Sequence, residues 1–403
     1  MNETGLKIKK LTTKYFPEIV SIRRHLHRYP ELSGEEHETM EFVASKLNEY
    51  GIPCQKGIAE TGVVGLIRGR NPDGMCIALR ADLDALAIQE LNDHDYCSLH
   101  PGKMHACGHD VHMACLLGAA RILNEIKDQL SGTVKLIFQP SEETYPGGAR
   151  RMIAAGVLDN PAPSFVIAQH VFPLLPAGHV GFKQGIFMAS TDEFTITVKG
   201  RGGHGAMPHI AVDPILIASH IVIALQQITS RNADPLVPTV VTVGRFIGEG
   251  RTNVIPDEVQ LQGTIRTFEE EWRKEMHQKI ETLVTGIATS MGGEASLTIA
   301  HGYPFVFNDE WLTGRLTELA AEYLGHECVK PVPQKMGAED FSYYGREIPS
   351  CLFVLGMADH IKGIGQNLHT ARFNVDESCL ETGTGILTWF AVRLLGKGMT
   401  KDE

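Results

Sequence analysis

Short apolar runs alternate with stretches of helical periodicity along much of the chain. Between residues 18 and 50, apolar side chains recur every three or four positions, which predicts a helix that is broken at Pro30. Its Arg23–His27 segment, with two arginines and two histidines, is interpreted as a solvated face. The shorter runs predict strands at Val63–Arg68, Met75–Ala81, Thr133–Phe138, Phe165–Ala168 and Cys351–Leu355. Because helices lie between some of these strands, the pattern predicts an α/β fold with an open, largely parallel sheet flanked by helices.

Side chains that bind metals or transfer protons follow four of these strands. They are Asp82 and Asp84 after Met75–Ala81, Glu142 and Glu143 after Thr133–Phe138, His170 after Phe165–Ala168, and His360 and His369 in the loop after Cys351–Leu355. In open parallel sheets, ligands bind at the carboxyl ends of the strands. Each of these residues alone has a plain structural explanation, such as a helix cap or a solvated loop. Together they predict a site at one edge of the sheet.

The stretch Met104–Ala120 supplies two further candidate ligands. Cys107 and His109 are separated by one glycine, and the apolar run Val111–Leu123 that follows has helical spacing. Asp110 therefore occupies a predicted N-cap position, and the helix N-terminus favours an ionised cysteine. Thiolate and imidazole are ligands that zinc prefers. Such a pair alone is more often packing, but beside four polar strand ends it predicts a metal site.

From about residue 188 to residue 302 the order of elements changes to strand, helix, strand, strand, helix, strand. The predicted elements are Asp192–Lys199, Pro214–Ser230, Thr239–Phe246, Val259–Thr267, Glu269–Met291 and Ala295–Ala300. This order is the ferredoxin-like plan, so we expect an inserted α+β lid or dimerisation domain at 188–302, between two parts of a catalytic domain at 1–187 and 303–403. The Gly200–Gly205 segment fits GxGxxG, but no helix opens directly after it, which argues against a dinucleotide site.

Composition narrows the class of protein and partner. The chain has 403 residues and a net charge of −11, which fits two globular domains and argues against nucleic acid or an anionic membrane as a partner. No apolar run reaches transmembrane length. Residues 1–17 lack the apolar core of a signal peptide, and the 8 cysteines are scattered without a disulfide framework. These features predict a cytoplasmic protein with reduced thiols.

The neighbouring Glu142 and Glu143 suit two different tasks. They lie in a loop between Pro140 and Gly147, so their side chains can point to different targets. If one carboxylate binds a metal, the other stays available as a base beside it. A metal-bound water has a pKa lowered towards 7, and the candidate ligands outnumber what one metal needs. Two metals about 3.5–4 Å apart would use them well.

A series of motifs in this order resembles a known family. They are Arg23-Arg-x-Leu-His-x-x-Pro-Glu-Leu, Leu79-Arg-Ala-Asp-Leu-Asp-Ala-Leu, Met104-His-Ala-Cys-Gly-His-Asp, Gln139-Pro-Ser-Glu-Glu, Gly203-His-Gly-Ala-x-Pro-His, Thr252-Asn-Val-Ile-Pro-Asp, Gly263-Thr-Ile-Arg-Thr-Phe and Gly337-Ala-Glu-Asp-Phe. Together they resemble the N-acyl-amino-acid amidohydrolases: hippurate hydrolases, bacterial aminoacylases and plant auxin-conjugate hydrolases. These form a branch of the dinuclear zinc metallopeptidases related to aminoacylase-1 and carboxypeptidase G. The resemblance covers nearly the whole chain.

The resemblance implies a role for each matching position. The implied metal ligands are Cys107, His109, Glu143, His170 and His369. It further implies that Glu142 is the general base, that Asp84 orients a metal ligand, and that His204 and Asn253 of the insert hold the substrate's carbonyl or carboxylate, with Arg266 as a weaker candidate for the carboxylate. The chain departs from the family pattern at Ala87, where proline is usual, and at Thr144, where glycine is common. These departures bear on substrate preference rather than on the chemistry.

The resemblance thus implies an enzyme that cleaves N-acyl amino acids, such as acetyl or benzoyl derivatives, with two divalent metal ions per chain. Zinc or manganese fits these ligands, and cobalt or nickel could replace them. The oxyanion would be stabilised by His204, and a homodimer through the insert is expected. Three alternatives stay open: a dipeptidase or aminopeptidase on the same site, a cysteine hydrolase that uses Cys107 with a separate histidine, and a non-catalytic metal-binding relative.

Overall fold

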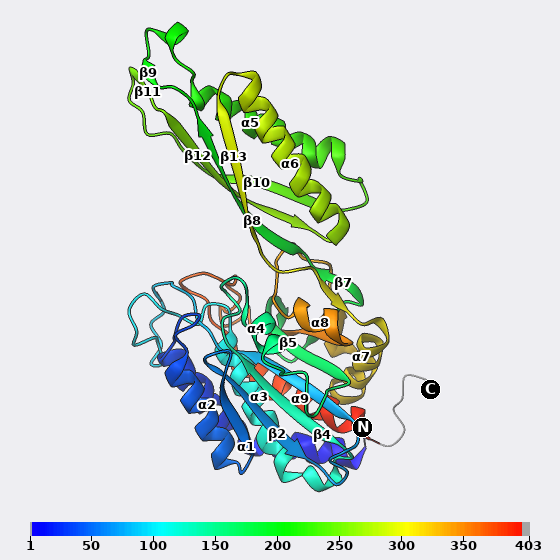
Figure 1. Ribbon diagram of the computed structural model, residues 1–403. Helices are drawn as coiled ribbons and strands as arrows, with labels where there is room; N and C mark the ends of the chain where they lie inside the picture. The colour runs from blue at the N-terminus through cyan, green and yellow to red at the C-terminus, as the bar shows by residue number, and fades with distance from the viewer. Residues whose placement is uncertain (1, 397–403) are drawn as a thin grey trace. The chain divides into compact units, whose positions relative to one another are not determined.

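The computed structural model describes residues 2–396 (Figure 1). The chain divides into two compact units. The larger unit comprises Met1–Phe187, Phe307–Pro333 and Asp340–Glu403, and the smaller unit comprises Met188–Val306 and Gln334–Glu339. The smaller unit therefore takes two separate segments of the chain, the second of them short.

An eight-stranded sheet forms the centre of the larger unit, in the order β1-β2-β4-β3-β5-β16-β6-β15. The strands are β1 (Cys54–Ile58), β2 (Gly62–Arg68), β3 (Cys76–Asp82), β4 (Thr133–Gln139), β5 (Phe165–Pro176), β6 (Val180–Phe182), β15 (Val329–Pro331) and β16 (Ser350–Ala358). The central strands β4, β3, β5 and β16 run parallel, and β2 and β6 pair antiparallel with them. β3, β4 and β16 are buried along their whole length, as expected for strands covered on both faces. The predicted fold class is confirmed.

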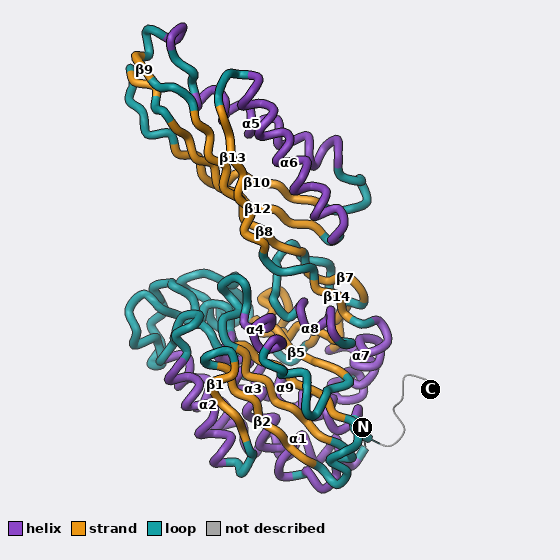
Figure 2. The backbone as a smooth tube through the Cα atoms, viewed as in Figure 1, coloured by secondary structure: helices purple, strands orange, loops and turns teal. Residues whose placement is uncertain are grey.

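Helices cover this sheet (Figure 2). They are α1 (Glu3–Arg28), α2 (His37–Glu49), α3 (His109–Glu125), α4 (Gly148–Ala154), α7 (Glu310–Leu324), α8 (Ser342–Glu347) and α9 (Cys379–Leu394). α3 is buried on nearly all sides and packs against α1 and α9, whereas α4 packs against α8. The first helix begins at Glu3 rather than near residue 18, because Asn2 caps it by accepting a hydrogen bond from the Gly5 amide at 3.0 Å, and Ile8 is fully buried.

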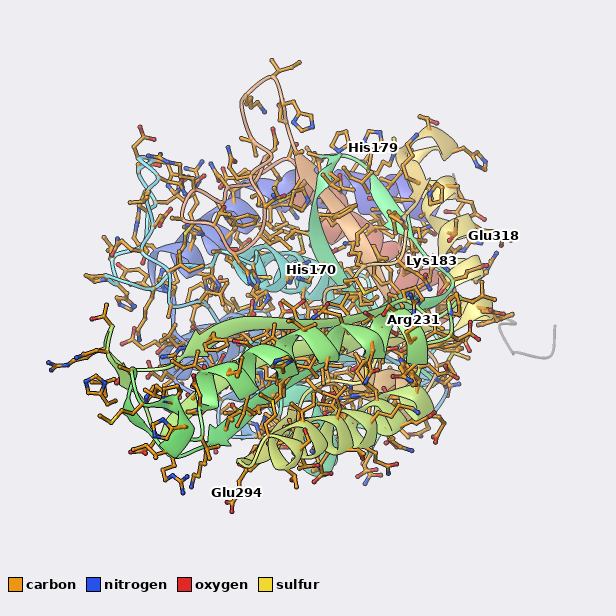
Figure 3. All side chains as sticks on the ribbon, turned by 90° about the horizontal axis from the view of Figure 1, so that it is seen from above. His170, His179, Lys183, Arg231, Glu294 and Glu318 are labelled. Atoms are coloured by element: carbon orange, nitrogen blue, oxygen red, sulfur yellow. The ribbon has the colours of Figure 1, made fainter. Side chains whose placement is uncertain are left out.

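The smaller unit has a four-stranded antiparallel sheet in the order β10-β12-β8-β13. Its elements are β8 (Ser190–Lys199), α5 (Pro214–Gln227), β10 (Thr239–Ile247), β12 (Glu258–Thr267), α6 (Glu270–Ser290) and β13 (Glu294–His301). The two helices lie side by side and pack on the sheet (Figure 3). Asp213 caps α5 by accepting a hydrogen bond from the Ile215 amide at 2.9 Å, and Pro214 occupies the first helical position.

The remaining elements are short. A two-stranded ribbon joins β9 (Gly203–His204) to β11 (Val254–Ile255) in the smaller unit. The strands β7 (Gly185–Met188) and β14 (Val306–Asn308) form a second small sheet. After the GxGxxG segment the next element is a short 3₁₀ helix, Pro208–Ile210, and the α-helix α5 begins only at Pro214. Within residues 2–396, the structure contains no helix with the length and apolar character needed to cross a membrane.

Candidate metal centre

The side chains that the sequence singles out come together near the carboxyl ends of β3 and β4. His170 lies inside β5, because this strand continues to Pro176 and does not end at Ala168 as predicted. Cys107 Sγ lies 3.5 Å from His170 Nε2 and 3.3 Å from His369 Nε2. Glu143 Oε1 lies 3.3 Å from His369 Nε2 and 3.9 Å from His109 Nε2. The Cys107 thiol therefore belongs to two groups of three possible metal ligands. The first group is Cys107, His109 and His170, and the second is Cys107, Glu143 and His369. Within each group the donor atoms lie within 4.8 Å of one another.

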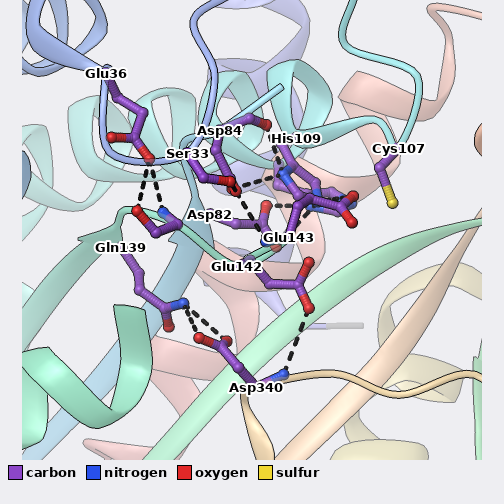
Figure 4. A network of polar contacts seen from close by, with 12 residues as sticks. Ser33, Glu36, Asp82, Asp84, Cys107, His109, Gln139, Glu142, Glu143 and Asp340 are labelled. Carbon is purple, nitrogen blue, oxygen red and sulfur yellow. Dashed lines mark hydrogen bonds and ion pairs between the residues drawn. The ribbon is translucent and has the colours of Figure 1, made fainter. Parts of the chain in front are cut away.

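The orientation of the His109 side chain is fixed by contacts of its Nδ1 with Asp84. Its Nδ1 donates a hydrogen bond to the backbone oxygen of Asp84 at 2.8 Å and lies 3.2 Å from the Asp84 carboxylate. That carboxylate also accepts hydrogen bonds from Ser33 Oγ at 2.6 Å and from the Glu143 amide at 2.9 Å (Figure 4). Asp84 thus holds both His109 and the backbone of Glu143, which leaves His109 Nε2 between two carboxylates, 3.7 Å from Asp82 Oδ2 and 3.9 Å from Glu143 Oε1.

Several buried atoms at this centre lack a hydrogen-bond partner among the described residues. Among them are His109 Nε2 and Glu143 Oε1, which lie 3.9 Å apart. Buried polar atoms are almost always hydrogen-bonded, so each exception calls for an explanation. A nitrogen lone pair and a carboxylate oxygen are both electron-pair donors, and a divalent cation would satisfy both at once. The donors present therefore fit a metal ion.

The electrostatics at the centre also fit a cation. Burial raises the pKa of the Cys107 thiol, and the carboxylates of Glu143 and Glu142 raise it further. Burial lowers the pKa of His109, but Asp82 and then Asp84 outweigh it and bring that pKa to about 10. The carboxylates thus raise both pKa values, in Cys107 in addition to the larger effect of burial. A divalent cation would offset this negative charge by favouring the thiolate and the neutral imidazole.

His112 and Asp82 form a support beneath the centre that sequence reasoning did not identify as one. His112 Nδ1 donates to Asp82 Oδ1 at 2.6 Å, and His112 Nε2 accepts a hydrogen bond from the Val171 amide at 2.9 Å. His170, one residue before Val171, in turn donates from Nδ1 to the Val171 carbonyl at 2.8 Å. Both nitrogens of His112 are engaged, so this residue supports the centre rather than binding an ion. Its position on α3, three residues after His109, is the sequence signal that could have indicated it.

A buried ionic network connects Asp82 to Glu142. Arg80 donates to Asp82 at 2.6 Å and to Asp340 at 2.9 Å, and the Asp340 carboxylate also accepts from Gln139 at 2.8 Å. The Asp340 amide lies 3.4 Å from Glu142 Oε1. Figure 4 shows Glu142 directed towards Asp340. The neighbouring glutamates thus have different targets, as the loop between Pro140 and Gly147 allows.

The model of one protein family matches residues 78–393, which is most of the chain. The chain belongs to peptidase family M20/M25/M40. It is 41% identical over 379 residues to the N-acetyl-L-cysteine deacetylase of Bacillus subtilis (strain 168), covering 94% of this chain and 88% of the relative. It is 42% identical over 305 residues to the N-acyl-L-amino acid amidohydrolase of Geobacillus stearothermophilus, covering 76% of this chain and 82% of the relative.

A solved structure from the same family has the same fold. This Bacillus subtilis protein, described as a dinuclear metal-binding peptidase of family M20, superposes with a TM-score of 0.80 at 35% identity, covering 95% of this chain and 99% of the other. The resemblance predicted from the sequence motifs is confirmed. The family M20 chain is therefore a metal-dependent hydrolase of amide bonds, the class of enzyme that the sequence predicts.

A second buried network in the family M20 chain corrects two predictions. Arg23 and His27 are fully buried rather than on a solvated face: Arg23 Nε donates to Asp110 at 2.8 Å, and His27 bridges Asp110 at 2.9 Å and Glu90 at 3.2 Å. Asp110 is therefore not the N-cap of α3, because its side chain is bonded to α1. The N-cap is Gly108, with φ of 84°. A periodic pattern cannot reveal this, since the partners of Arg23 and His27 lie far away in sequence.

The candidate residues of the smaller unit are only partly brought together. His204 pairs with Val254 across the β9–β11 ribbon, and the Gly205 amide donates to the Asn253 carbonyl at 2.8 Å, so His204 and Asn253 are neighbours. Both are exposed. Arg266 lies on β12, which begins at Glu258 near the ribbon, and eight further residues of extended strand span roughly 26 Å. The guanidinium of Arg266 contacts Thr264 and the Ile265 carbonyl of its own strand.

Proposed function

We propose that this protein hydrolyses N-acyl amino acids to a carboxylic acid and a free amino acid, at a site that holds two divalent metal ions. The observation that carries the proposal is that Cys107 belongs to two neighbouring groups of three possible metal ligands. Glu142 lies beside these groups, and its carboxylate faces the Asp340 amide. A site for two ions would need two neighbouring groups of donors, and these two groups would supply them. The names of the two sequence relatives indicate the substrate class, and the relative of known structure is described as dinuclear.

The contacts of each residue indicate its role in the proposed reaction. The ligands are Cys107, His109, Glu143, His170 and His369. Divalent ions held by these residues would supply a Lewis acid for the amide carbonyl and would lower the pKa of the attacking water. Glu142 accepts a proton from that water and delivers it to the leaving nitrogen, so that the amide and one water become an acid and an amine. Asp84 holds His109 and Glu143 in fixed positions relative to each other, because it accepts a hydrogen bond from each of them. Zinc or manganese fits this mixture of sulfur, nitrogen and oxygen donors, with cobalt or nickel as substitutes.

The smaller unit contributes substrate contacts in this proposal. We assign His204 to the oxyanion that forms when the carbonyl is attacked, and Asn253, its neighbour on the ribbon, to the substrate's carbonyl or carboxylate. Both are exposed, and several glycines around them let the backbone approach a ligand closely. Arg266 is the weaker candidate for the carboxylate, because it lies far along β12 from the ribbon.

We also propose a homodimer formed through the smaller unit. Strand β10 has no partner on its outer edge within the four-stranded sheet, and such an edge is a template for a second strand. Apolar side chains are exposed nearby in the sequence: Leu216 is 50% exposed, Ile223 70% and Phe246 44%. An Ile223→Glu variant should shift the molar mass measured by light scattering towards that of a monomer. A wild-type protein that is monomeric at micromolar concentration would contradict the dimer.

The test of the function is a substrate panel combined with metal analysis. Acetyl, benzoyl and indole-acetyl amino acids are compared with unblocked dipeptides, and bound metal is measured per chain. We expect hydrolysis of at least one acylated series, loss of activity with a chelator, recovery with added zinc, manganese or cobalt, and about two ions per chain. Turnover of unblocked dipeptides alone would favour a dipeptidase.

We further propose that the enzyme works in the cytoplasm. The 8 cysteines are all free, which supports this location.

A further inference from the structure

Glu36 is a fully buried carboxylate whose partners lie near the candidate metal centre. Its Oε1 accepts hydrogen bonds from the Ser141 amide at 2.7 Å and from Ser141 Oγ at 3.2 Å. Its Oε2 accepts one from Thr61 Oγ1 at 2.7 Å. Glu36 precedes α2, yet its side chain makes no capping bond to that helix. Both of its oxygens are instead directed to other segments, and one of them takes two donors from the residue before Glu142.

Ser141 has an unusual backbone conformation. Its φ is 52°, in the left-handed region that residues with a Cβ rarely adopt. Such a conformation persists only where the surroundings impose it, and it is concentrated at functional sites. The Ser141 carbonyl accepts a hydrogen bond from the Gly148 amide at 2.9 Å, while its amide and hydroxyl are bound by Glu36. The polar groups of Ser141 are therefore all engaged, and Glu36 supplies most of that restraint.

The residues after Ser141 depend on this conformation. The Glu143 amide donates to Asp84 at 2.9 Å, whereas Glu142 faces the Asp340 amide at 3.4 Å. A change of φ at Ser141 from left-handed to extended would rotate the chain that follows it, and neither contact could be kept without other movements. The hydrogen bonds from Glu36 are thus placed where they control the direction of both glutamates.

We propose that Glu36 is a positioning residue: by holding Ser141 in the left-handed conformation, it directs Glu143 to the metal centre and Glu142 beside it. This inference rests on the proposed function for the roles of the two glutamates. The task requires a hydrogen-bond acceptor facing Ser141 rather than a negative charge. A glutamine could perform it, because its oxygen can accept from Ser141 while its amide donates to the Thr61 hydroxyl.

The first part of the test compares Glu36→Ala with Glu36→Gln. For Glu36→Ala we expect metal affinity, measured by competition with a chromogenic chelator, to fall by about 10- to 100-fold, the range seen when supports of metal ligands are removed. Turnover at saturating metal should also fall, because Glu142 is misdirected. Glu36→Gln should lose far less of both. If Glu36→Ala does not fold, Glu36→Asp, whose carboxylate is retracted by one methylene, takes its place in the comparison.

The second part is a rescue. Glycine adopts positive φ without a steric cost, so Ser141→Gly placed in the Glu36→Ala background should restore part of the lost metal affinity and turnover. The matched control is Glu60→Gly in the same background. Glu60 also has positive φ, of 80°, but its side chain is exposed and pairs with Arg151. Glu60→Gly therefore relieves the backbone strain of a positive φ at a position outside the Glu142–Glu143 loop. It should restore neither metal affinity nor turnover.

The outcomes separate the two proposals. Unchanged metal affinity and turnover in Glu36→Ala would overturn the role of Glu36, as would a rescue by Ser141→Gly that is no larger than the one by Glu60→Gly. If the wild-type protein hydrolyses no N-acyl amino acid, the proposed function fails. The chelator competition still judges Glu36 in that case, because it needs no substrate.

Discussion

The cluster around Cys107 contains candidate metal-binding histidines and the β9–β11 ribbon a candidate substrate-binding histidine, and the two regions hold them differently. In the cluster, His109 is fully buried, and its Nδ1 is bonded to the Asp84 carbonyl, which fixes the direction of the other nitrogen. On the ribbon, His204 is exposed, and its Nδ1 accepts only the amide of Ala206, two residues away, at 3.0 Å. The ribbon is positioned by backbone pairing between Gly203–His204 and Val254–Ile255.

The difference indicates two kinds of task. Metal ligands must be oriented before the ion arrives, and the hydrogen bonds that orient them contribute to affinity. A group that meets the substrate can remain exposed until the substrate is bound. Substitutions in the cluster should therefore change metal content and activity together, whereas substitutions on the ribbon should change activity alone.

The largest effect is expected for Cys107→Ala. Because the thiol belongs to both groups of three donors, its removal should cost at least one bound ion and bring hydrolysis close to background. Metal per chain is measured by elemental analysis and turnover with an acylated amino acid. Cys54→Ala, which removes a half-buried thiol elsewhere, is the control and should behave as wild type. A Cys107→Ala protein with full metal content and normal rate would show that the thiol is not a ligand.

Within the cluster, substitutions of Glu142 and Glu143 should have different effects. Glu142→Gln should keep its metals and lose about two to four orders of magnitude in turnover, the usual contribution of a general base. Glu143→Gln should lose metal, because its carboxylate contacts His369 and faces His109. The same metal and rate measurements check both variants. The reverse result would mean that the two neighbouring glutamates have exchanged roles.

On the ribbon, His204→Ala should lower turnover by about 100- to 1,000-fold, as expected for one oxyanion donor, and should leave metal content unchanged. His209→Ala removes another exposed histidine of the same unit and serves as the control. Retained turnover in His204→Ala would remove this residue from the mechanism. A loss of metal would contradict the division between the cluster and the ribbon.

The smallest effect concerns the stability of the smaller unit in acid. Burial raises the pKa of Asp192, but the hydrogen bonds from Arg273 and His277 outweigh it and lower that pKa to about 2. The pKa in the unfolded chain is about 3.9, so the carboxylate contributes on the order of 2 kcal/mol above pH 4, and this is lost as the pH falls towards 2. Asp192→Asn should therefore flatten the acid unfolding curve followed by circular dichroism. Glu294→Gln, at an exposed position of β13, should leave the curve unchanged.

Much of the fold was predictable because its signals are local. β3 ends at Asp82 and β4 ends shortly before Glu142, both after apolar runs, and parallel pairing brings such ends to one edge. The end of β5 was predicted too early, because this strand continues past His170 to Pro176. The elements of the smaller unit were also predicted to within a few residues. Buried charges were harder: Arg80 lies inside a strand and pairs with Asp340, which is distant in the sequence. Its burial depends on that partner, and a pattern of residues cannot identify partners.

The same limit explains the errors in α1 and α3. Arg23 and His27 repeat at helical spacing with polar neighbours, which normally indicates a face in water. They are buried because Asp110 and Glu90 supply the opposite charges. Asp110 fits the composition of an N-cap, yet its carboxylate is already committed to α1. Glu36 and Ser141 were missed for a different reason, because the left-handed φ of a serine leaves no mark in the sequence.

The glycine between Cys107 and His109 has a consequence for anyone who transfers this loop to another protein. Gly108 has φ of 84°, and a methyl group at its Cα would collide with the Val171 side chain of β5. A library that randomises the loop should therefore return glycine at this position, even after Val171 is trimmed to alanine, because the backbone requirement remains. A graft must copy the close approach of loop and strand along with the ligands. The contact between the Gly108 backbone and the Val171 side chain is therefore part of what must be transferred, although neither residue is a metal ligand.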